Sequence, residues 1–538
     1  MITLSKSEYM MFLKHPAWLW LKKNDKKKLP EPDANLQALF DAGNLFEDYG
    51  EARFEKIDRI GFDSYDQYLS VPARTQKAID EGSEVLSQGR FETSFDDQKI
   101  TCIVDVIQKV GIKTFDLYEI KSSTKVKPEH IYDLAFQTVV LEKAGYKVRN
   151  VFVIYCNNLY VRQGRIDPLK MSVQEDVTTK VRSKIDSTMR NISAALKTAV
   201  SADMPDPTPR RAKLGSYKDW LDIFLSLKPQ ADASSIYKLT QALPEQIGKL
   251  EDMHIVSLLD IPDDFELKDV QLRQVEANKS KLPSINTDKI TKFVESLEYP
   301  LYFLDYETLS SIVPPFDGTK PYEQLPFQYS LHIIAEPGAE LEHKEFLHTL
   351  DTNPIPDLMT ALSTSIGPKG TVLVWYEGFE KKCNERMARI LPEYASFLED
   401  INSRIIDLMV PFKNGYYVDK AFEGSASIKK VLPVLAPELN YGDMEIQEGG
   451  SAQRLWMQSV YEDIHSQSEV DKIMADLLQY CELDTYAMVR IFEFLLAISE
   501  GQIVDTVLEA EIDDSLSPQA NPDISPDSSG PAEQMSLL

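Results

Sequence analysis

Two acidic residues stand one residue apart at the end of a short apolar run, in the stretch Tyr299–Thr308 (YPLYFLDYET). Alternate residues of a β-strand share a face, so we expect the carboxylates of Asp305 and Glu307 to point the same way. Carboxylates held together at the end of a buried strand repel each other unless a positive charge lies between them, and a divalent metal ion can supply that charge. The alternative interpretation is a strand that runs out into a polar turn.

Further residues of this kind follow along the chain. Glu380 comes shortly after the predicted strand Thr371–Tyr376, in a segment that opens a helix. Tyr480 and Asp484 are four residues apart in the predicted helix Leu477–Thr485, so they share a helix face. The alternative is that these two side chains merely face solvent on a C-terminal helix.

A second group of chemically capable residues lies in the N-terminal part. Asp105 falls in the predicted strand Ile100–Ile107, and Glu119 and Lys121 share one face of the next strand, Thr114–Lys121. Two acids can hold a metal ion that polarises a phosphodiester and activates water. A lysine on the same face can orient or deprotonate that water, or stabilise charge in the transition state. The alternative is a surface salt bridge between Glu119 and Lys121.

The elements that must position these residues form an α/β protein. Helical patterns cover residues 1–30, 35–55 and Tyr132–Ala144. A strand is expected at Val151–Tyr155, and a further strand, after Glu307, is expected at Pro321–His332. A Pro-rich break at 203–211 precedes short helices over 216–290. We therefore expect an α/β core at 1–201, a linker and short helical connector at 202–290, a C-terminal α/β domain at 291–502 and a disordered acidic tail at 503–538. The connector segment Ile247–Pro262 is interpreted either as a packing spacer or as a helix-hairpin-helix-like DNA contact.

Composition narrows the class of protein. With 43% hydrophobic and 27% charged residues, the chain is typical of a soluble globular protein. It shows no membrane-spanning apolar run and no secretion signal, so we expect a cytoplasmic protein with no membrane partner. The 4 cysteines are far apart, which argues against disulfides and cysteine-based zinc, and the 7 histidines are scattered, so we expect no His-rich metal site. A metal would then be held by oxygen, which favours Mg²⁺ or Mn²⁺.

The net charge of -27 argues at first against nucleic acid as a partner. Whole-chain charge is a weak criterion here, because the acidic tail and the acidic sites contribute much of it. Lys121, Lys125 and Lys127 form a local basic patch that can meet a phosphate backbone.

The N-terminal pattern of Asp105, Glu119-Ile120-Lys121 and then Gln137 resembles the RecB-like branch of the PD-(D/E)XK nucleases. In that branch a Gly-x-x-x-His is usual, and here Gly43-x-x-x-Glu47 stands in its place, so Glu47 would serve as an oxygen ligand or an outer-shell residue. The resemblance implies a nuclease core in which Asp105, Glu119 and Glu47 bind metal and Lys121 and Gln137 assist catalysis.

Two departures from this branch concern other positions. Leu141 stands where a tyrosine is often found. The segment Lys14-His15-Pro16 resembles the Cys-Pro start of the iron–sulfur members, with His15 in place of the cysteine, and the later cysteine triplet is missing near Leu214–Tyr217. The resemblance therefore implies a core without an iron–sulfur cluster.

The C-terminal motifs resemble the tyrosine subtype of the DEDD exonucleases, which have an RNase H-like fold. Asp305 and Glu307 match the first motif, Glu380 stands where an aspartate is usual, and the third motif matches Tyr480 and Asp484. The resemblance implies that the four carboxylates hold two metal ions, that these activate water and stabilise charge on the scissile phosphate, and that Tyr480 orients the attacking water.

The order of these parts over roughly residues 1–500 also resembles a bacterial family of unassigned function that pairs the two nuclease-like halves. The last five residues, Gln534, Met535, Ser536, Leu537 and Leu538, resemble the pentapeptide by which bacterial proteins dock on the replication sliding clamp. A flexible tether that presents a glutamine and apolar anchors suits such docking. The alternative is a frayed terminus.

Together the motifs predict a metal-dependent nuclease, with exonuclease action on DNA expected, in bacterial DNA repair or in defence against phage and mobile elements. Two alternatives stay open. One is an adaptor that binds nucleic acid or the clamp with one or both nuclease cores inactive, and the other is an RNase.

Overall fold

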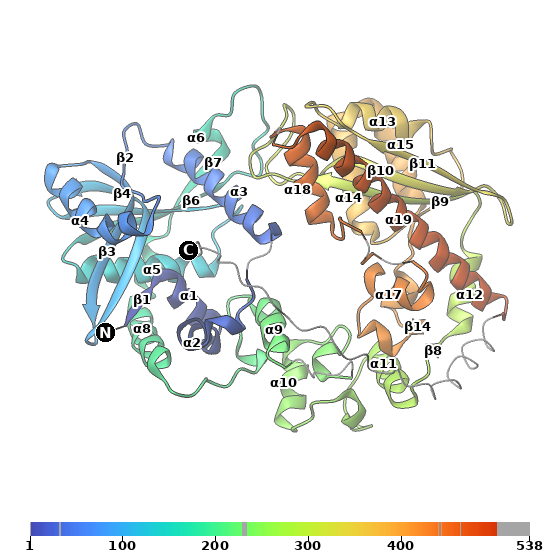
Figure 1. The fold of residues 1–538 in the computed structure, drawn as a ribbon, viewed down its shortest axis with the longest axis horizontal. Coiled ribbons are helices and arrows are strands. Elements are labelled where there is room, and N and C mark those ends of the chain that lie inside the picture. Colours follow the sequence, from blue (N-terminus) through green and yellow to red (C-terminus); the bar gives the residue numbers. More distant parts are fainter. Residues whose placement is uncertain are drawn as a thin grey trace, which may run out of the picture.

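The structure is a computed structural model that describes residues 2–31, 34–228, 234–439, 441–442, 444–462 and 464–502. The predicted tail with Gln534–Leu538 lies outside the described residues. An N-terminal part, a helical connector and a C-terminal part follow one another around a ring (Figure 1). The predicted α/β class is confirmed, because helices pack on a sheet in both the N-terminal and the C-terminal part. No described helix is long and apolar enough to cross a membrane.

A seven-stranded sheet organises the N-terminal part. Its strands follow in the order β2 (Asp58–Arg59), β3 (Val85–Phe95), β4 (Gln98–Gly111), β5 (Thr114–Lys121), β6 (Lys147–Cys156) and β7 (Ser172–Asp176), with β1 (Thr3–Ser5) parallel to β4. The helices of this part are α1 (Lys6–Lys14), α2 (Pro16–Asn24), α3 (Ala34–Glu51), α4 (Tyr65–Glu81), α5 (Pro128–Lys143), α6 (Pro168–Met171), α7 (Thr178–Arg182) and α8 (Ile185–Val200).

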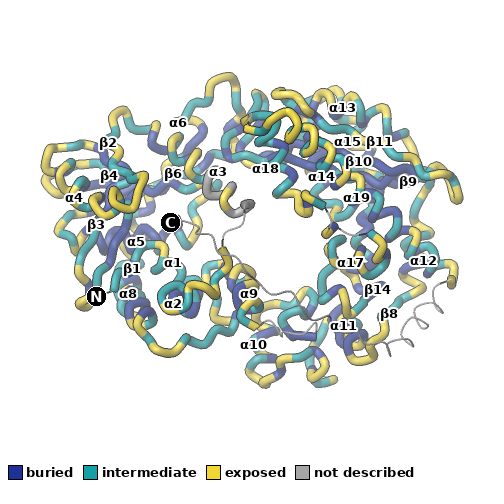
Figure 2. Tube along the Cα trace, in the orientation of Figure 1, coloured by how far each residue is buried: buried dark blue, intermediate teal, exposed yellow. Residues whose placement is uncertain are grey.

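Strand β5 separates two hydrophobic clusters by alternation. Phe115 and Leu117 join the cluster formed with α5, whereas Tyr118 and Ile120 join the cluster formed with Phe46 of α3. The same alternation directs Glu119 and Lys121 toward α5, as the sequence predicts. The buried residues concentrate in the strands of the two sheets and on the helix faces that cover them (Figure 2).

The structure does not contain the single helix expected over residues 1–30. Ser5 and Glu8 form a capping box at the start of α1. The chain then leaves the helix at His15, whose backbone is extended (φ -159°, ψ 127°), and Pro16 begins α2. A residue before proline is disfavoured in the α conformation, which explains the break.

Short helices form the connector. They are η2 (Pro209–Arg211), α9 (Tyr217–Ser226), η3 (Ile236–Lys238), α10 (Pro244–Asp252), η4 (Leu258–Asp260) and α11 (Asp269–Ser280). Strand β8 (Ser284–Ile285), which the sequence assigns to the connector, pairs with β14 (Tyr417–Val418) of the C-terminal part. Helix α12 (Thr287–Glu295) then packs against α19, so residue 290 lies inside a helix of the C-terminal core.

A five-stranded mixed sheet organises the C-terminal part. Its order is β11 (Leu341–Leu347), β10 (Leu325–Ile334), β9 (Leu301–Leu309), β12 (Thr371–Val374) and β13 (Ile405–Asp407). Strand β9 is antiparallel to β10 and parallel to β12. The helices are α13 (Ile355–Ser363), α14 (Glu377–Ile390), α15 (Ala395–Arg404), α16 (Val410–Lys413), α17 (Ile428–Leu435), α18 (Gly449–Val460) and α19 (Gln467–Ser499).

Helices cover both faces of this sheet. On one face the Tyr306 hydroxyl donates to Asn384 of α14 at 3.0 Å. On the other, the Gln328 amide donates to the Leu477 carbonyl of α19 at 2.8 Å. The sheet is therefore buried on both sides, and β9, which carries Asp305 and Glu307, lies at its centre.

The loop between β9 and β10 joins the two large parts. The Arg162 guanidinium donates to the Pro314 carbonyl at 2.9 Å, and Ile312 is buried in the N-terminal cluster that contains Phe46 and Tyr118. The loop begins at Ser310, three residues after Glu307, so the C-terminal acids are connected directly to the N-terminal core.

Candidate functional sites

Three carboxylates converge in the C-terminal part. Asp305, Glu307 and Asp484 each offer an oxygen, and these oxygens all lie within 4.8 Å of one another. Glu380 adds a fourth acid, since its charge raises the pKa of Tyr306 and the charges of Asp305 and Glu307 raise its own. We call Asp305, Glu307, Glu380 and Asp484 the C-terminal carboxylate set. The structure thus brings three of these acids within ligating distance of one another, and Glu380 lies near enough to interact electrostatically with Asp305 and Glu307.

Three elements position this set. Asp305 and Glu307 lie on one face of β9, which is paired on both sides and so held in register. Asp484 comes from the middle of α19, which packs on that face. Glu380 lies in the first turn of α14, directly after β12, where Tyr376 takes a left-handed backbone conformation (φ 82°) to turn the chain from strand to helix.

Burial favours the protonated form of every acid in the set, and for three of them repulsion between the acids adds to this effect. Burial raises the pKa of Asp305, Glu307 and Glu380 well above the ordinary range, and neighbouring acids of the set raise these pKa values further. Burial also raises the pKa of Asp484, to about 6. One oxygen of Glu380 is buried without a hydrogen-bond partner among the described residues.

The carboxylate oxygens of the set are suited to bind a divalent cation. A hard ion such as Mg²⁺ or Mn²⁺ takes carboxylate oxygens as ligands. It would supply the positive charge that these buried acids lack and would use the bare Glu380 oxygen. The donor set therefore fits a magnesium or manganese site.

Two tyrosines and a lysine surround the set. The Tyr441 hydroxyl donates to Asp484 Oδ1 at 2.6 Å. Tyr480 is buried, and its pKa is raised by burial and by the charges of Asp484 and Glu307. Lys429 Nζ lies 5.8 Å from the centre of the Tyr480 ring and donates to the Gln447 carbonyl. Its charge partly offsets the rise in the pKa values of Glu307 and Asp484.

Sequence reasoning missed Tyr441, Lys429 and Gly449. A Cβ atom at Gly449 would come within 3.4 Å of Glu307 Oε2, so the start of α18 approaches the carboxylate closely. Helix α18 also contacts α3, the helix of Glu47. Lys429 lies in α17 and Tyr441 in the segment after it. Neither residue belongs to a spacing pattern that the sequence reveals.

The N-terminal residues also meet. Lys121 Nζ lies 2.5 Å from Glu119 Oε1, and the Gln137 amide donates to Glu119 Oε2 at 2.5 Å. The ladder of β4 and β5 stops short of Asp105, whose Oδ2 accepts instead from the Ile120 amide at 2.7 Å. The structure thus brings together Asp105, Glu119, Lys121 and Gln137 between the sheet and α5.

Two residues that the sequence did not single out complete this N-terminal polar cluster. Lys6 Nζ lies 2.9 Å from Glu119 Oε1 and 3.6 Å from Asp133 Oδ1. Asp133 also pairs with Lys121 at 2.9 Å. Asp133 stands four residues before Gln137 on α5, a spacing that could have revealed it. Lys6 carries no such signal, because only the tertiary fold brings α1 to β5.

Charge in this cluster is largely compensated. Burial disfavours the ammonium of Lys6, but the carboxylates of Asp133, Glu119 and Asp105 outweigh burial and raise its pKa. Burial opposes the carboxylate of Asp133 as well, yet Lys121 and Lys6 hold its pKa below the usual range. Asp105 differs, since burial and the charge of Glu119 raise its pKa well above the ordinary value.

Glu47 lies close to this cluster without joining it through a hydrogen bond that the structure records. Its carboxylate accepts from the Gln88 amide, and burial and the charge of Glu51 raise its pKa. The charge of Glu47 in turn raises the pKa of Asp105. Among the described residues, the acids of this part do not form a group of three ligating oxygens within 4.8 Å, in contrast with the C-terminal set.

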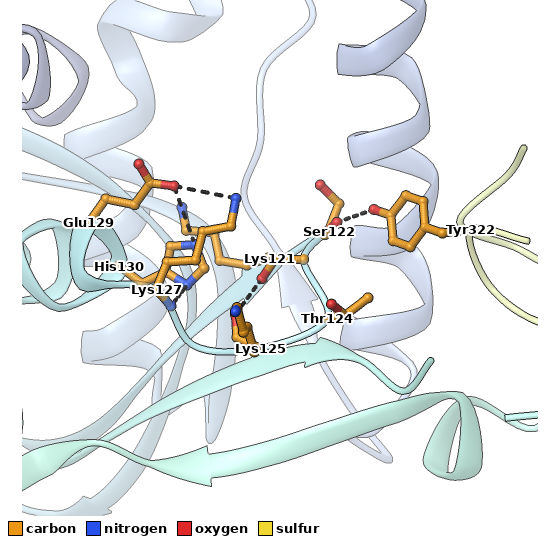
Figure 3. Close-up of a pocket in the computed structure, with 9 residues that line it drawn as sticks. Lys121, Ser122, Thr124, Lys125, Lys127, Glu129, His130 and Tyr322 are labelled. Atoms are coloured by element: carbon orange, nitrogen blue, oxygen red, sulfur yellow. Dashed lines mark hydrogen bonds and ion pairs between the residues drawn. The ribbon is translucent and has the colours of Figure 1, made fainter. Parts of the chain in front are cut away.

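A basic pocket of about 510 Å³ opens beside Lys121 (Figure 3). It is lined by Lys121, Ser122, Ser123, Thr124, Lys125, Lys127, Glu129, His130 and Tyr322. Tyr322 belongs to the loop between β9 and β10, and its hydroxyl donates to the Ser122 carbonyl. The pocket is therefore built from both large parts, and three lysines give it the charge that a phosphate backbone would require.

His15, at the position compared with a cluster cysteine, has a structural role. Its buried ring stacks on Trp220 with 4.0 Å between ring centres, and its Nδ1 accepts from the Ala17 amide. Burial lowers the pKa of His15 to about 4. The neutral ring thus caps α2 and fastens the N-terminal helices to the connector.

Replacing Lys121 by Ala should lower the free energy of unfolding by about 3 kcal/mol, because it leaves Asp133 and Glu119 with Lys6 as their remaining ammonium partner. Urea unfolding followed by circular dichroism measures the change. Lys125→Ala is the matched control, since Lys125 lies on the exposed loop four residues further on. Equal, small losses in both variants would contradict the importance of the buried ion pairs.

Comparison with known proteins gives two findings. A family profile described as a domain of unknown function (DUF2779) matches residues 302–427. Similar curated proteins include "Uncharacterized protein MG366 homolog" of Mycoplasma pneumoniae, 26% identical over 235 residues, and "Uncharacterized protein MG366" of Mycoplasma genitalium, 24% identical over 264 residues. The matches cover 40% and 42% of this chain and only 35% and 39% of the two relatives. The matched range 302–427 includes Asp305, Glu307 and Glu380, and ends before Tyr480 and Asp484.

Proposed function

We propose that this chain is a metal-dependent nuclease that hydrolyses phosphodiester bonds, with DNA as its substrate. The observation that carries the proposal is the convergence of Asp305, Glu307 and Asp484, whose oxygens lie within 4.8 Å of one another in a half-buried site. Gathering buried acids that repel one another destabilises a fold, so such a set points to a function that needs it.

In this proposal the C-terminal set would hold Mg²⁺ or Mn²⁺ through its carboxylate oxygens, and the metal would supply positive charge for phosphodiester hydrolysis. Tyr441 fixes the side chain of Asp484 through its 2.6 Å hydrogen bond. Tyr480 keeps its proton at neutral pH, because its pKa is raised, and can therefore donate a hydrogen bond that orients the attacking water.

The finer fold assignments belong to the same proposal. For residues 291–502 the RNase H-like assignment is supported by acids on a central strand, on the helix after β12 and on α19, in the order that the motifs require. For residues 1–201 the PD-(D/E)XK assignment is supported by the contacts of Lys121 and Gln137 with Glu119. Bacterial DNA repair, or defence against phage and mobile elements, is the setting that the resemblance implies.

One observation favours a second role for the N-terminal part. Lys6 and Lys121 both pair with Glu119, so ammonium groups occupy the side of this carboxylate where a catalytic ion would bind. The N-terminal core would then bind DNA through its basic pocket and leave cleavage to the C-terminal set. In that case Glu119→Gln preserves cleavage, whereas the pair Lys125→Ala and Lys127→Ala weakens DNA binding.

The test is a cleavage assay with labelled single-stranded DNA, double-stranded DNA and RNA, each with Mg²⁺ or Mn²⁺. The wild type should cleave, and the double variant Asp305→Asn/Glu119→Gln, purified in parallel to control for contaminating nucleases, should not. The two single variants assign the activity to one half, and the RNA arm decides the RNase alternative. Equal cleavage by wild type and double variant would refute the proposal.

We also propose that the terminal pentapeptide binds the bacterial replication sliding clamp. The support is its sequence, in which Gln534 and the apolar Leu537 and Leu538 are suited to a hydrophobic docking pocket. Gln534→Ala should abolish co-elution with the clamp in gel filtration, whereas Met535→Ala, at the unspecified position of the pentapeptide, should retain it. Co-elution that survives deletion of residues 534–538 would rule out this partner.

A further inference from the structure

A second group of metal-ligating side chains lies beside the carboxylate set, on strands β10 and β11 and helix α19. His332 of β10 and His343 of β11 are directly opposite each other in the antiparallel ladder, and Glu482 comes from α19. One ligating atom from each lies within 4.8 Å of the other two. The two imidazole rings stack with 4.4 Å between their centres. This group, the His-His-Glu triad, shares no residue with the C-terminal carboxylate set.

Hydroxyl groups behind the triad hold one nitrogen of each ring. His332 Nδ1 lies 2.8 Å from Thr485 Oγ1, and His343 Nε2 lies 2.9 Å from Ser330 Oγ. The two hydroxyls are 2.7 Å apart, and the Thr485 hydroxyl donates to the Glu482 carbonyl at 3.1 Å.

This network has an arrangement in which every proton has an acceptor. The imidazoles donate from His332 Nδ1 to Thr485 and from His343 Nε2 to Ser330, and Ser330 donates to Thr485. Lone pairs then remain on His332 Nε2 and His343 Nδ1, and the latter lies 3.8 Å from Glu482 Oε1. Histidine ligands of metal ions in proteins are oriented in this way, by a hydrogen bond from the ring nitrogen that does not bind the metal.

The triad is open to solvent on one side only. His332 is buried, the side chain of His343 is 24% exposed and that of Glu482 is 50% exposed. An ion can therefore approach the triad from the side of Glu482 and His343.

We propose that His332, His343 and Glu482 bind one divalent transition-metal ion, with Zn²⁺ as the ion that the donors favour. Two imidazole nitrogens and one carboxylate oxygen are ligands typical of zinc, whereas Mg²⁺ requires oxygen. The ion would fasten α19 to strand β10 and to the edge strand β11. Because α19 also carries Tyr480 and Asp484, the ion acts as a structural clamp that holds these two residues over β9. This inference goes beyond the proposed nuclease and does not depend on it.

The test measures zinc bound to the full-length protein. Protein freed of metal with a chelator is dialysed against Zn²⁺ with excess Mg²⁺, and bound zinc is counted by mass spectrometry and titrated by calorimetry. The wild type and Asp305→Asn should each bind one tightly held Zn²⁺, and His343→Ala should lose it. Ser330→Ala, which removes only the hydroxyl behind His343, should weaken zinc binding about 10- to 100-fold.

Controls separate loss of the ion from loss of the fold. Glu482→Gln changes an exposed ligand and should weaken binding with an unchanged circular dichroism spectrum, and His254→Ala, an exposed histidine of the connector, should bind zinc like the wild type. Co²⁺ in place of Zn²⁺ should give visible absorption bands that disappear in His343→Ala. Zinc retained in His343→Ala, or zinc lost in Asp305→Asn, would overturn the proposal.

Discussion

Replacing Asp305 by Asn should lower the rate of phosphodiester hydrolysis at the C-terminal set by about 10³-fold or more. The change removes one charged ligand from a group of oxygens that lie within 4.8 Å of one another. Metal stabilisation of transition-state charge contributes several kcal/mol to such reactions, and each 1.4 kcal/mol corresponds to about a factor of ten in rate. The rate is measured on 3′-labelled and 5′-labelled DNA in a Glu119→Gln background, which removes any contribution from the N-terminal part.

Asp407→Asn is the matched control. Asp407 is also a buried acid at the end of a strand of the same sheet, but its Oδ1 accepts the amides of Tyr376 and Met409, each at 3.0 Å. An asparagine oxygen can accept the same bonds, so this variant should keep a rate close to that of the parent protein. A comparable loss in both variants would show that the effect of Asp305→Asn arises from the fold rather than from the site.

Metal ions should stabilise the C-terminal part, and more so as the pH rises. An acid whose pKa is higher in the folded than in the unfolded chain binds more protons when folded, so the free energy of unfolding falls as pH rises. For the carboxylate set this loss begins near the ordinary carboxyl pKa of about 4. It passes through about pH 6 for Asp484 and continues at higher pH for Asp305, Glu307 and Glu380.

A bound metal ion removes this loss of stability at high pH, because its charge takes the place of the protons on the carboxylates. At pH 7.5, Mg²⁺ or Mn²⁺ at about 100 times its dissociation constant adds about 2.7 kcal/mol, which corresponds to about 5 °C or more in the unfolding midpoint of a domain of this size. At pH 5 the shift should be smaller. Differential scanning calorimetry with and without chelator measures it.

The effect of metal on the wild type is compared with its effect on Asp305→Asn. This comparison is needed because buried histidines also change the free energy of unfolding with pH. His15, His130 and His332 have pKa values lowered to about 4, so their contribution is lost as pH falls and has the opposite sign. They are unchanged in the variant. Without metal, Asp305→Asn should be more stable than the wild type at pH 7.5, since it relieves repulsion, and it should gain little from Mg²⁺. A wild type that is the more stable of the two in chelator would contradict the electrostatic account.

Local patterns in the sequence were sufficient for much of the fold around the C-terminal set. Alternation along Leu301–Leu309 predicted that Asp305 and Glu307 share a face, and a spacing of four predicted the same of Tyr480 and Asp484. These are relations between near neighbours, which backbone geometry alone determines.

Residues that enter the sites through distant segments were not predicted. Lys6 reaches Glu119 across 113 residues, and Tyr441 reaches Asp484 across 43, and neither contact leaves a local spacing signal. The pairing of His332 with His343 depends on the register of β10 and β11, which the sequence reasoning did not establish. The break at His15 could have been predicted, because Pro16 follows it directly.

The central claim is that divalent ions held by the C-terminal carboxylates contact the scissile phosphate. A DNA substrate with a sulfur in place of one non-bridging oxygen, cleaved by the Glu119→Gln protein, tests it most directly. Magnesium binds sulfur poorly and manganese binds it better, so the sulfur should slow cleavage about tenfold or more in Mg²⁺, and Mn²⁺ should restore most of the rate. An equal sulfur effect in both metals, with each of the two sulfur stereoisomers, would contradict the account.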